Sequence, residues 1–263
     1  MGIKTAITHA DLPDRYRHLE LIPTVNGIME SVYLLSHLYV LKIFKNTISY
    51  STIENETALL WALDGFPVPK VVDQFTINTH PAIVYTQIPG TSIVKPGTRH
   101  IKEIALFLKA FHTKSQHIKL PFRLEKYSRT SLQEMIDTLQ DPLMDHYFHT
   151  IDISLKNEGI IHGDLFPDNC KFNKDRLSGV FDFSDSALGD FHFDLAVVAV
   201  GWCFEGTTLC IHKVSILLKY YGSPLDMTAF KTYIRYALLY YATTRYISDQ
   251  NYTELLQRLK GIL

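Results

Sequence analysis

The pattern of apolar and polar residues changes along this chain, from strand-like runs in the first part to helical periodicity beyond about residue 100. Residues 31–44 read SVYLLSHLYVLKIF, two runs of strand-forming residues that predict a hairpin about Ser36-His37. Upstream, Val25-Asn26-Gly27 predicts the end of a first strand and a turn. Two further strands are predicted at VVDQF (71–75) and AIVY (82–85). The chain therefore begins with a β-rich region.

One helix interrupts these strands, in the segment STIENETALLWALDG (51–65). Ser51 and Glu54 have the spacing of a capping box, in which the two side chains bond the backbone amides at a helix start. Gly65 then stands where a helix would end. The predicted order is strand, hairpin, helix, strand, strand.

Helical patterns dominate after a polar linker predicted near residues 87–100, which contains Pro89-Gly90. Apolar residues then recur at i, i+3, i+4 and i+7 from Ile101 and predict a helix that ends at His112. Further helices are predicted at 129–139, 143–157, 192–204, 208–221 and 227–246. We predict an α+β fold with a small β-rich lobe (1–88), a larger helical lobe (89–263) and a ligand cleft between them.

Composition and charge fit an ordinary globular protein, with 46% apolar and 20% charged residues. The balance of 26 basic against 27 acidic residues gives no reason to expect nucleic acid or a membrane surface as a partner. Three cysteines make neither a disulfide framework nor a zinc pattern. The N-terminus lacks the apolar core of a signal peptide, and no stretch has the length of a membrane span. These features predict a cytoplasmic protein and leave monomer and homodimer both open.

The residues that carry chemistry lie in IHGDLFPDNCKF (161–172) and in GVFDFSDSALGDFHFDLAVV (179–198). Asp164 precedes Asn169 by five residues, and Asp182 follows thirteen residues later inside an apolar run. Protein kinases use this order: the first Asp accepts the proton of the substrate hydroxyl, and the Asn and second Asp hold Mg²⁺. A lone HGD would fit a polar loop beside a buried strand, but the paired spacing favours ATP-dependent phosphoryl transfer.

Two segments of the β-rich region carry candidates for binding the nucleotide phosphates. Lys42 interrupts an apolar strand, and Glu56 on the following helix is its natural partner, as in kinases. The alternative for Lys42 alone is the solvent face of an edge strand. The turn 26–31 has the place of a phosphate-covering loop, with Ser31 and the amides of residues 29 and 30 as donors, but one glycine also fits an ordinary turn.

Other polar residues are interpreted as structural. Asp194 falls at the start of a predicted helix, where a carboxylate favours the helix dipole, and we expect it to brace the loop that contains Asp164. His162 is expected to pack behind the same loop. The pair His146-x-x-His149 matches no known metal motif.

At these residues the chain resembles the aminoglycoside phosphotransferase and choline kinase family, which has a protein-kinase-like two-lobe fold. The resemblance runs from Asn26-Gly27 to about Tyr246. It implies ATP and Mg²⁺, with a catalytic base, two metal ligands, a strand lysine and a helix glutamate at Asp164, Asn169, Asp182, Lys42 and Glu56 respectively. It also implies that residues 85–90, including Gln87 and Ile88, form the hinge that meets adenine. About ten residues separate Phe183 from the helix near Asp194, too few for a peptide-docking segment, so a small acceptor is expected.

Within this family the chain is most similar to the homoserine kinases of the same fold, through HGDLFPDN and the segment 177–205, which includes Trp202. Arg235 and Arg245 fall in a late helix where those enzymes also carry arginines. The chain differs in its shorter length, in its glycine loop and at Ser184-Asp185. The resemblance implies L-homoserine as the acceptor and O-phospho-L-homoserine, a threonine precursor, as the product.

Homoserine is zwitterionic, so its ammonium needs a carboxylate and its carboxylate needs a cation. Asp185 and Arg245 are the candidates, with Trp202 beside them. Choline, thiamine, an aminoglycoside or a sugar stay open as acceptors. A non-catalytic kinase-like binding module is also open, but such a protein usually lacks the lysine, the base or a metal ligand.

Overall fold

A computed structural model of the protein describes residues 5–24 and 30–262. The chain divides into two compact units. The first contains the described residues up to Pro89 together with Gly179–Ser184, and the second contains Gly90–Ser178 and the residues from Asp185 onward. The segment that carries Asp182 thus belongs to the first unit, although it follows most of the second unit in sequence.

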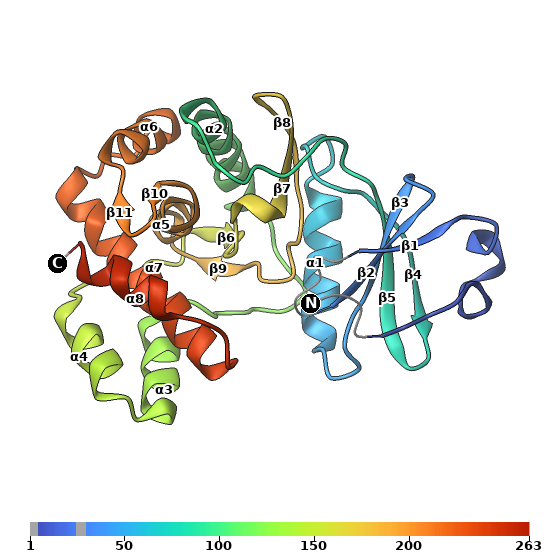
Figure 1. Cartoon of the computed structure of the whole chain (residues 1–263), viewed down its shortest axis with the longest axis horizontal. Coiled ribbons are helices and arrows are strands. Elements are labelled where there is room, and N and C mark those ends of the chain that lie inside the picture. The colour runs from blue at the N-terminus through green and yellow to red at the C-terminus, as the bar shows by residue number, and fades with distance from the viewer. Residues whose placement is uncertain (1–4, 25–29, 263) are drawn as a thin grey trace. The chain divides into compact units, whose positions relative to one another are not determined.

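The first unit is built on an antiparallel five-stranded sheet with the order β1-β2-β3-β5-β4 (Figure 1). The predicted hairpin is confirmed: β2 and β3 pair, with Val32 opposite Lys42. Ser36 and His37 between them have φ angles of 48° and 56°, the left-handed turn that suits the twist of a hairpin. The strands are β1 (Leu21–Pro23), β2 (Ser31–Leu35), β3 (Tyr39–Ile43), β4 (Val71–Ile77) and β5 (His80–Thr86).

Successive side chains along each strand point to opposite faces of this sheet, and the two faces have different surroundings. Leu35, Leu41 and Val84 belong to an apolar core shared with Leu12 and Tyr16 from the N-terminal segment. Lys42 lies between Leu41 and Ile43 in β3, so its side chain points to the other face. It is only 6% exposed, which excludes the solvent-facing alternative.

Helix α1 (Tyr50–Ala62) follows β3, but the predicted capping box is wrong. The cap is Ser49, which has extended backbone angles, and no side-chain cap bond is made. The hydroxyl of Ser49 instead contacts that of Ser51 at 2.5 Å. The helix ends at Ala62, and Gly65 takes a left-handed φ of 88° just beyond it.

The second unit is mainly helical, and α5 lies at its centre, packed against α2, α6 and α7. Almost every residue of α5 is buried, so the helix is apolar all round rather than amphipathic. The small strand pair β6 (Gly159–Ile161) and β9 (Ala187–Gly189) flanks the loop that carries Asp164. The helices are α2 (Thr98–Ser115), α3 (Arg129–Leu139), α4 (Pro142–Thr150), α5 (Phe191–Trp202), α6 (Ile211–Tyr221), α7 (Met227–Ile247) and α8 (Thr253–Lys260).

Three helical predictions need correction in this unit. Helix α4 ends at Thr150, seven residues before the predicted end, because Ile151 turns to an extended backbone. Helix α6 starts at Ile211 because residues before it form the hairpin of β10 (Phe204–Glu205) and β11 (Thr208–Leu209). Helix α8 was not predicted, since its eight residues are too few for a clear periodic signal.

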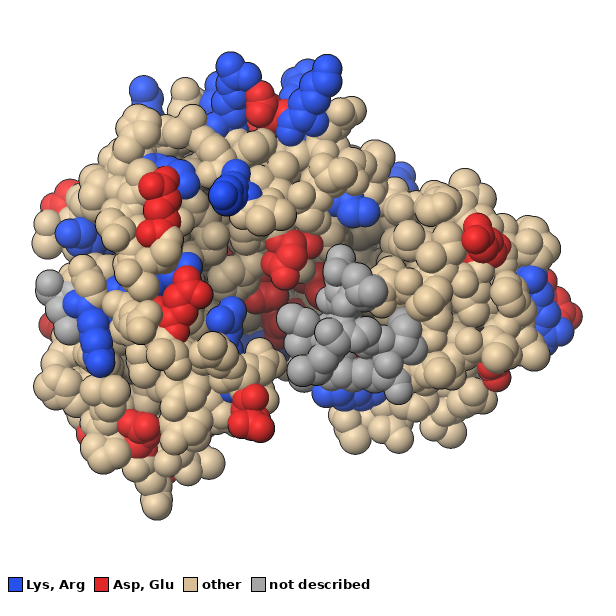
Figure 2. Space-filling view, viewed as in Figure 1, with Lys and Arg blue, Asp and Glu red and all other residues tan. Residues whose placement is uncertain are grey.

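The distribution of charged side chains on the surface agrees with the near-neutral net charge of the sequence. On the face drawn in Figure 2, Lys and Arg side chains lie among Asp and Glu side chains over the second unit. Within the described part of the chain, no helix combines the length and the apolar character that a membrane crossing needs.

Candidate functional site

In the first unit, Lys42, Glu56 and Asp182 come together although 140 residues separate the first from the last. The ammonium of Lys42 lies 2.7 Å from Oδ1 of Asp182 and 3.7 Å from Oε2 of Glu56. Lys42 and Glu56 are almost completely buried. The strand lysine and the helix glutamate therefore meet as the sequence predicted, with Asp182 as the nearer partner.

Burial and charge act against each other in this cluster. Burial disfavours the charged form of Lys42, but the carboxylates of Asp182 and Glu56 outweigh it and raise the pKa of Lys42. Burial raises the pKa of Glu56 to about 7, and Lys42 at 3.7 Å does not offset this. The hydroxyl of Tyr85 donates to Oε1 of Glu56 at 3.1 Å. Burial of Glu56 thus favours its protonated form relative to an exposed glutamate.

Asp182 adopts an unusual backbone conformation, with a φ of 64°. Left-handed angles are disfavoured for L-residues, but Asp tolerates them better than most. The hydroxyl of Ser184 donates to Oδ1 of Asp182 at 2.8 Å, the same oxygen that contacts Lys42. The backbone turn and these two contacts fix the direction of the carboxylate.

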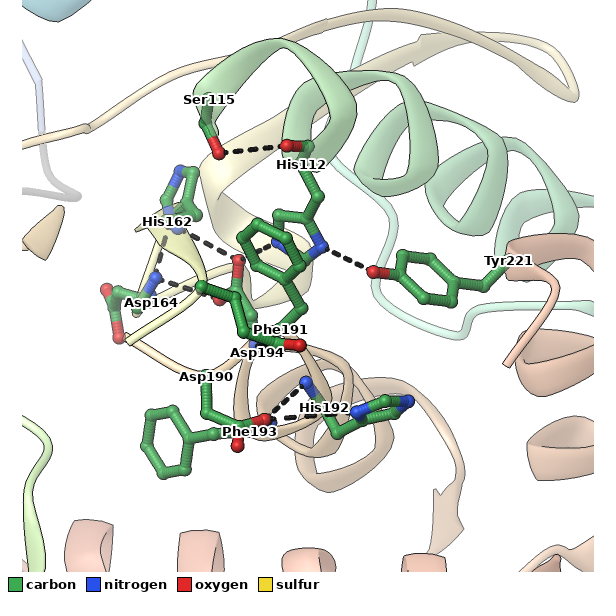
Figure 3. Close-up of polar contacts among 12 residues, drawn as sticks. His112, Ser115, His162, Asp164, Asp190, Phe191, His192, Phe193, Asp194 and Tyr221 are labelled. Carbon is green, nitrogen blue, oxygen red and sulfur yellow. Dashed lines mark hydrogen bonds and ion pairs between the residues drawn. The ribbon is translucent and has the colours of Figure 1, made fainter. Parts of the chain in front are cut away.

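In the second unit, buried Asp194 holds the loop that carries Asp164 (Figure 3). Its Oδ2 accepts the backbone N–H of His162 and its Oδ1 accepts that of Gly163, both at 2.9 Å. Burial opposes charge on Asp194, but the hydrogen bond from His112 and the backbone bonds keep its pKa below the ordinary value. The expectation that Asp194 braces this loop is confirmed.

His112 extends this brace into two helices (Figure 3). Its Nε2 lies 2.9 Å from Oδ2 of Asp194, its Nδ1 lies 2.9 Å from the hydroxyl of Tyr221, and its ring stacks on Phe191 at 4.2 Å. From the sequence, His112 was predicted only as the last residue of a helix, whereas α2 continues to Ser115. A polar residue that continues an apolar helix face was the signal that could have revealed it.

Asp164 and Asn169 are joined directly. The amide nitrogen of Asn169 donates to the backbone oxygen of Asp164 at 2.7 Å and to its Oδ2 at 2.9 Å. Pro167 starts a single 3-10 turn that ends at Asn169, and this turn folds the amide back onto Asp164. Both donor contacts use the nitrogen end, so the carbonyl oxygen of Asn169 is the end available as a ligand.

Two tyrosines enclose Gly163, immediately before Asp164. The hydroxyl of Tyr241 on α7 donates to the backbone oxygen of Gly163. On the other side, a Cβ built on Gly163 would lie 2.1 Å from the hydroxyl of Tyr127, and Gly163 has a φ of 79°. Tyr127 donates to the backbone oxygen of Asp185 at 2.9 Å. Neither tyrosine was predicted, because nothing in its local sequence marks it.

The predicted substrate residues have different environments in the second unit. Trp202 is 1% exposed, and its indole N–H donates to the backbone oxygen of Leu165 at 2.9 Å. This makes it a brace of the Asp164 loop, and we do not carry it forward as a substrate contact. Asp185 is exposed, and Arg245 lies half-buried on α7 one turn beyond Tyr241.

The other residues of the first unit that were predicted to bind the nucleotide make ordinary structural contacts. Ser31 is buried at the start of β2, and its hydroxyl accepts the N–H of Thr5 at 2.7 Å. The N–H of Gln87 donates to the backbone oxygen of Leu38 at 3.2 Å, and Ile88 lies against Gly179. Residues 26–29 of the predicted phosphate loop lie outside the described residues. The convergence of the site residues on one cleft stays a prediction.

A separate group of Glu158, Asp190 and His192 has ligand atoms within 4.8 Å of one another. Their oxygens already serve the fold: Asp190 accepts the N–H of His192 at the start of α5, and Glu158 accepts that of Phe191. This group is therefore interpreted as helix capping.

Comparison with known proteins identifies the family. Residues 22–230 match the phosphotransferase enzyme family. The chain belongs to this family. A homoserine kinase of Sinorhizobium medicae is 30% identical over 182 residues, which cover 62% of this chain and 55% of that protein. A homoserine kinase of Methylocella silvestris is 28% identical over 284 residues, covering 94% of this chain and 88% of that protein. The match to the first relative thus spans about half of its length.

Solved structures agree with the fold. The GDP complex of aminoglycoside 2'-phosphotransferase-IIIa has a TM-score of 0.69 at 19% identity, with 92% of each chain covered. A choline kinase from Streptococcus pneumoniae has a TM-score of 0.66 at 17% identity, with 93% of each chain covered. These similarities confirm the predicted kinase-like α+β fold.

Proposed function

We propose that this protein is a small-molecule kinase that transfers the γ-phosphoryl group of ATP to the hydroxyl of L-homoserine. The observation that carries the proposal is the arrangement of Asp164, with its carboxylate bonded to Asn169 and its loop braced by Asp194. The similarity to homoserine kinases supports the choice of acceptor.

Asp164 is proposed as the group that accepts the proton of the acceptor hydroxyl. The hydroxyl oxygen attacks the γ-phosphorus, the bond to the β-phosphate oxygen breaks, and ADP leaves. Most of the catalytic effect in such transfers comes from positioning and charge stabilisation, so a fixed carboxylate is more useful than a mobile one. The contacts to Asn169 and through Gly163 supply that fixation.

The first unit is proposed to bind the nucleotide. Lys42 would contact the phosphates, and Glu56 would hold Lys42 once phosphate oxygens take the place of Asp182. The hydroxyl of Ser31 would assist at the phosphates, and the backbone at Gln87 and Ile88 would meet the adenine. Nucleotide use is supported by a structural relative solved with GDP, so GTP is tested beside ATP.

Asn169 and Asp182 are proposed to hold Mg²⁺. The donors fit this ion, because Mg²⁺ prefers carboxylate and amide oxygens and keeps several waters, so that two protein ligands suffice. Asn169 points its amide nitrogen at Asp164, which leaves its carbonyl oxygen as the ligand end. When bound, Mg²⁺ neutralises charge on the β- and γ-phosphates.

The acceptor is proposed to bind the second unit near Asp164, with Asp185 for its ammonium and Arg245 for its carboxylate. Arg245 follows Tyr241 by one turn of α7, and Tyr241 bonds Gly163, so the guanidinium lies on the helix that borders the catalytic loop. Choline is the second candidate, on the structural similarity to a choline kinase. Thiamine, aminoglycosides and sugars are further candidate acceptors.

A coupled assay of ADP release tests the proposal, with Mg-ATP or Mg-GTP and each of these acceptors in turn. Homoserine-dependent turnover, with O-phosphohomoserine detected by ³¹P NMR, is the expected result. Turnover on another alcohol but not on homoserine would refute the acceptor and keep the kinase. Nucleotide binding without turnover on any acceptor would favour a kinase-like binding module.

A further inference from the structure

The peptide unit that joins Gly163 to Asp164 is held at both of its polar atoms. Its oxygen, which belongs to Gly163, accepts a hydrogen bond from the hydroxyl of Tyr241 on α7. Its N–H, which belongs to Asp164, donates to Nδ1 of His162 at 3.2 Å. A backbone N–H can only donate, so Nδ1 of His162 carries no hydrogen and acts as the acceptor. The peptide immediately before the proposed base is therefore fixed by two different side chains.

This peptide needs such contacts because a glycine precedes it. Gly163 has a φ of 79°, a left-handed conformation that glycine adopts more readily than any other residue. The backbone of glycine is also the least restricted, and a rigid peptide plane can rotate about the bonds to its two flanking Cα atoms. Loss of the bond at the oxygen would let the plane rotate. Rotation would weaken the bond from the Asp164 N–H to His162 and change the direction of the chain at Asp164.

The catalytic loop also holds the ring of Tyr241. Phe166, two residues after Asp164, packs edge-on against this ring, with the ring centroids 5.0 Å apart. Gly201 of α5 leaves room for Phe166, since a Cβ built on Gly201 would lie 2.6 Å from that ring. Burial, together with the carboxylate of Asp164, raises the pKa of Tyr241 well above its usual range. The hydroxyl therefore keeps its hydrogen and stays a donor to the carbonyl.

We propose that Tyr241 is a positioning residue for the catalytic base, whose hydroxyl fixes the Gly163–Asp164 peptide and thereby the direction of the Asp164 carboxylate. This inference rests on the proposed role of Asp164 and adds to it a residue that lies 78 positions after Gly163 in the sequence. Phosphoryl transfer depends chiefly on positioning and charge stabilisation. The contribution of Tyr241 therefore belongs to turnover and not to nucleotide binding.

The test is Tyr241→Phe in the full chain, which removes the hydroxyl and keeps the ring that packs on Phe166. A displacement of about 1 Å can cost ~10²-fold in rate, so kcat is expected to fall by roughly 10- to 100-fold. KM for ATP should be unchanged. Hydrogen exchange, measured by mass spectrometry of a fragment that contains residues 162–166, should become faster because the Asp164 N–H loses its fixed partner.

Tyr236→Phe is the matched control. The hydroxyl of Tyr236, also on α7, donates to the backbone oxygen of Tyr127 at 3.0 Å, so this variant loses the same kind of bond outside the Asp164 loop. Both variants should be folded and should unfold at slightly lower urea than the wild type. In Tyr236→Phe, kcat and the exchange of the fragment should match the wild type. Equal falls of kcat in the two variants would overturn the inference, because they would reflect a general loosening.

Exchange and turnover together separate this inference from the proposed acceptor. Faster exchange with a lower kcat in Tyr241→Phe supports the inference, measured with homoserine or with whichever acceptor the wild type phosphorylates. Unchanged exchange, or faster exchange with an unchanged kcat, would overturn it and leave the kinase in place. Faster exchange in Tyr241→Phe, with a wild type that does not turn over homoserine, would support the contact with the loop and refute the acceptor.

Discussion

Replacing Asp194 by Asn should strongly destabilise the second unit, although the two side chains have nearly the same shape. The carboxylate accepts three hydrogen bonds, from the backbone of His162, the backbone of Gly163 and the ring of His112. An amide turns one acceptor into a donor, so at least one buried N–H faces another donor. The partners are all buried, so no water is at hand to replace the lost bond.

The expected size follows from the bonds affected. A hydrogen bond to a charged group contributes about 1.5–3 kcal/mol, and an unsatisfied buried donor costs about 1–3 kcal/mol. Asp194→Asn should therefore lower the free energy of unfolding by roughly 2.5–6 kcal/mol, against about 5–15 kcal/mol typical of a native protein. Urea unfolding followed by fluorescence measures this, and kcat should fall in the folded fraction because the Asp164 loop loosens.

A graded control and a pH dependence sharpen this prediction. Tyr221→Phe removes one neutral bond to His112 and should cost only about 0.5–1.5 kcal/mol. The folded pKa of Asp194 is lowered, so its contribution is present above its ordinary value of 3.8 and is lost as the pH falls below it. The Asn variant should lack this loss. An Asp194→Asn protein within about 0.5 kcal/mol of wild type, with unchanged kcat, would refute the assigned brace, since that is the range of an ordinary surface change.

Three further outcomes are expected. Asp164→Asn should lower kcat by ~10²–10⁴ with little change in ATP affinity by calorimetry; parallel losses would mean a structural or metal role. Gly163→Ala should unfold at lower urea, because its Cβ would lie 2.1 Å from the hydroxyl of Tyr127 and its φ is left-handed; an unchanged midpoint would contradict that packing. Glu56 has a pKa raised to about 7, so the stability it contributes is full below 4.5 and falls as the pH rises through 7, by on the order of 3 kcal/mol. Urea titrations of Glu56→Gln should lack that fall, and the same fall in the variant would assign it to another group.

The sequence predicted the elements that carry a strong local pattern. The β2–β3 hairpin followed from alternation and a turn, and α3 matched its predicted bounds. The start of α1 was missed because Ser49 and Ser51 are both good caps, and only the backbone of Ser49 distinguishes them. The end of α4 was missed because the residues after Thr150 continue an apolar pattern in an extended conformation.

Among the candidate site residues, those that share one contiguous motif could be proposed from the sequence, and those that only packing brings to the loop could not. Asp164 and Asn169 share one loop, so their spacing was informative. His112 and Tyr241 reach that loop from helices far away in sequence, and no local pattern links them to it.

The division of the chain has a consequence for the order in which the protein is made. The first unit includes Gly179–Ser184, so a ribosome that has released residues up to Pro89 has not yet supplied all of its parts. Until Asp182 emerges, Lys42 cannot pair with its nearest carboxylate. The backbone bond from Val180 to Pro67 cannot form either. Domains usually fold as units during synthesis, N-terminal first. Here the N-terminal unit cannot be completed until most of the second unit has been synthesised. A nascent chain halted near residue 90 should therefore be cleaved by a protease more readily than one that has passed residue 184.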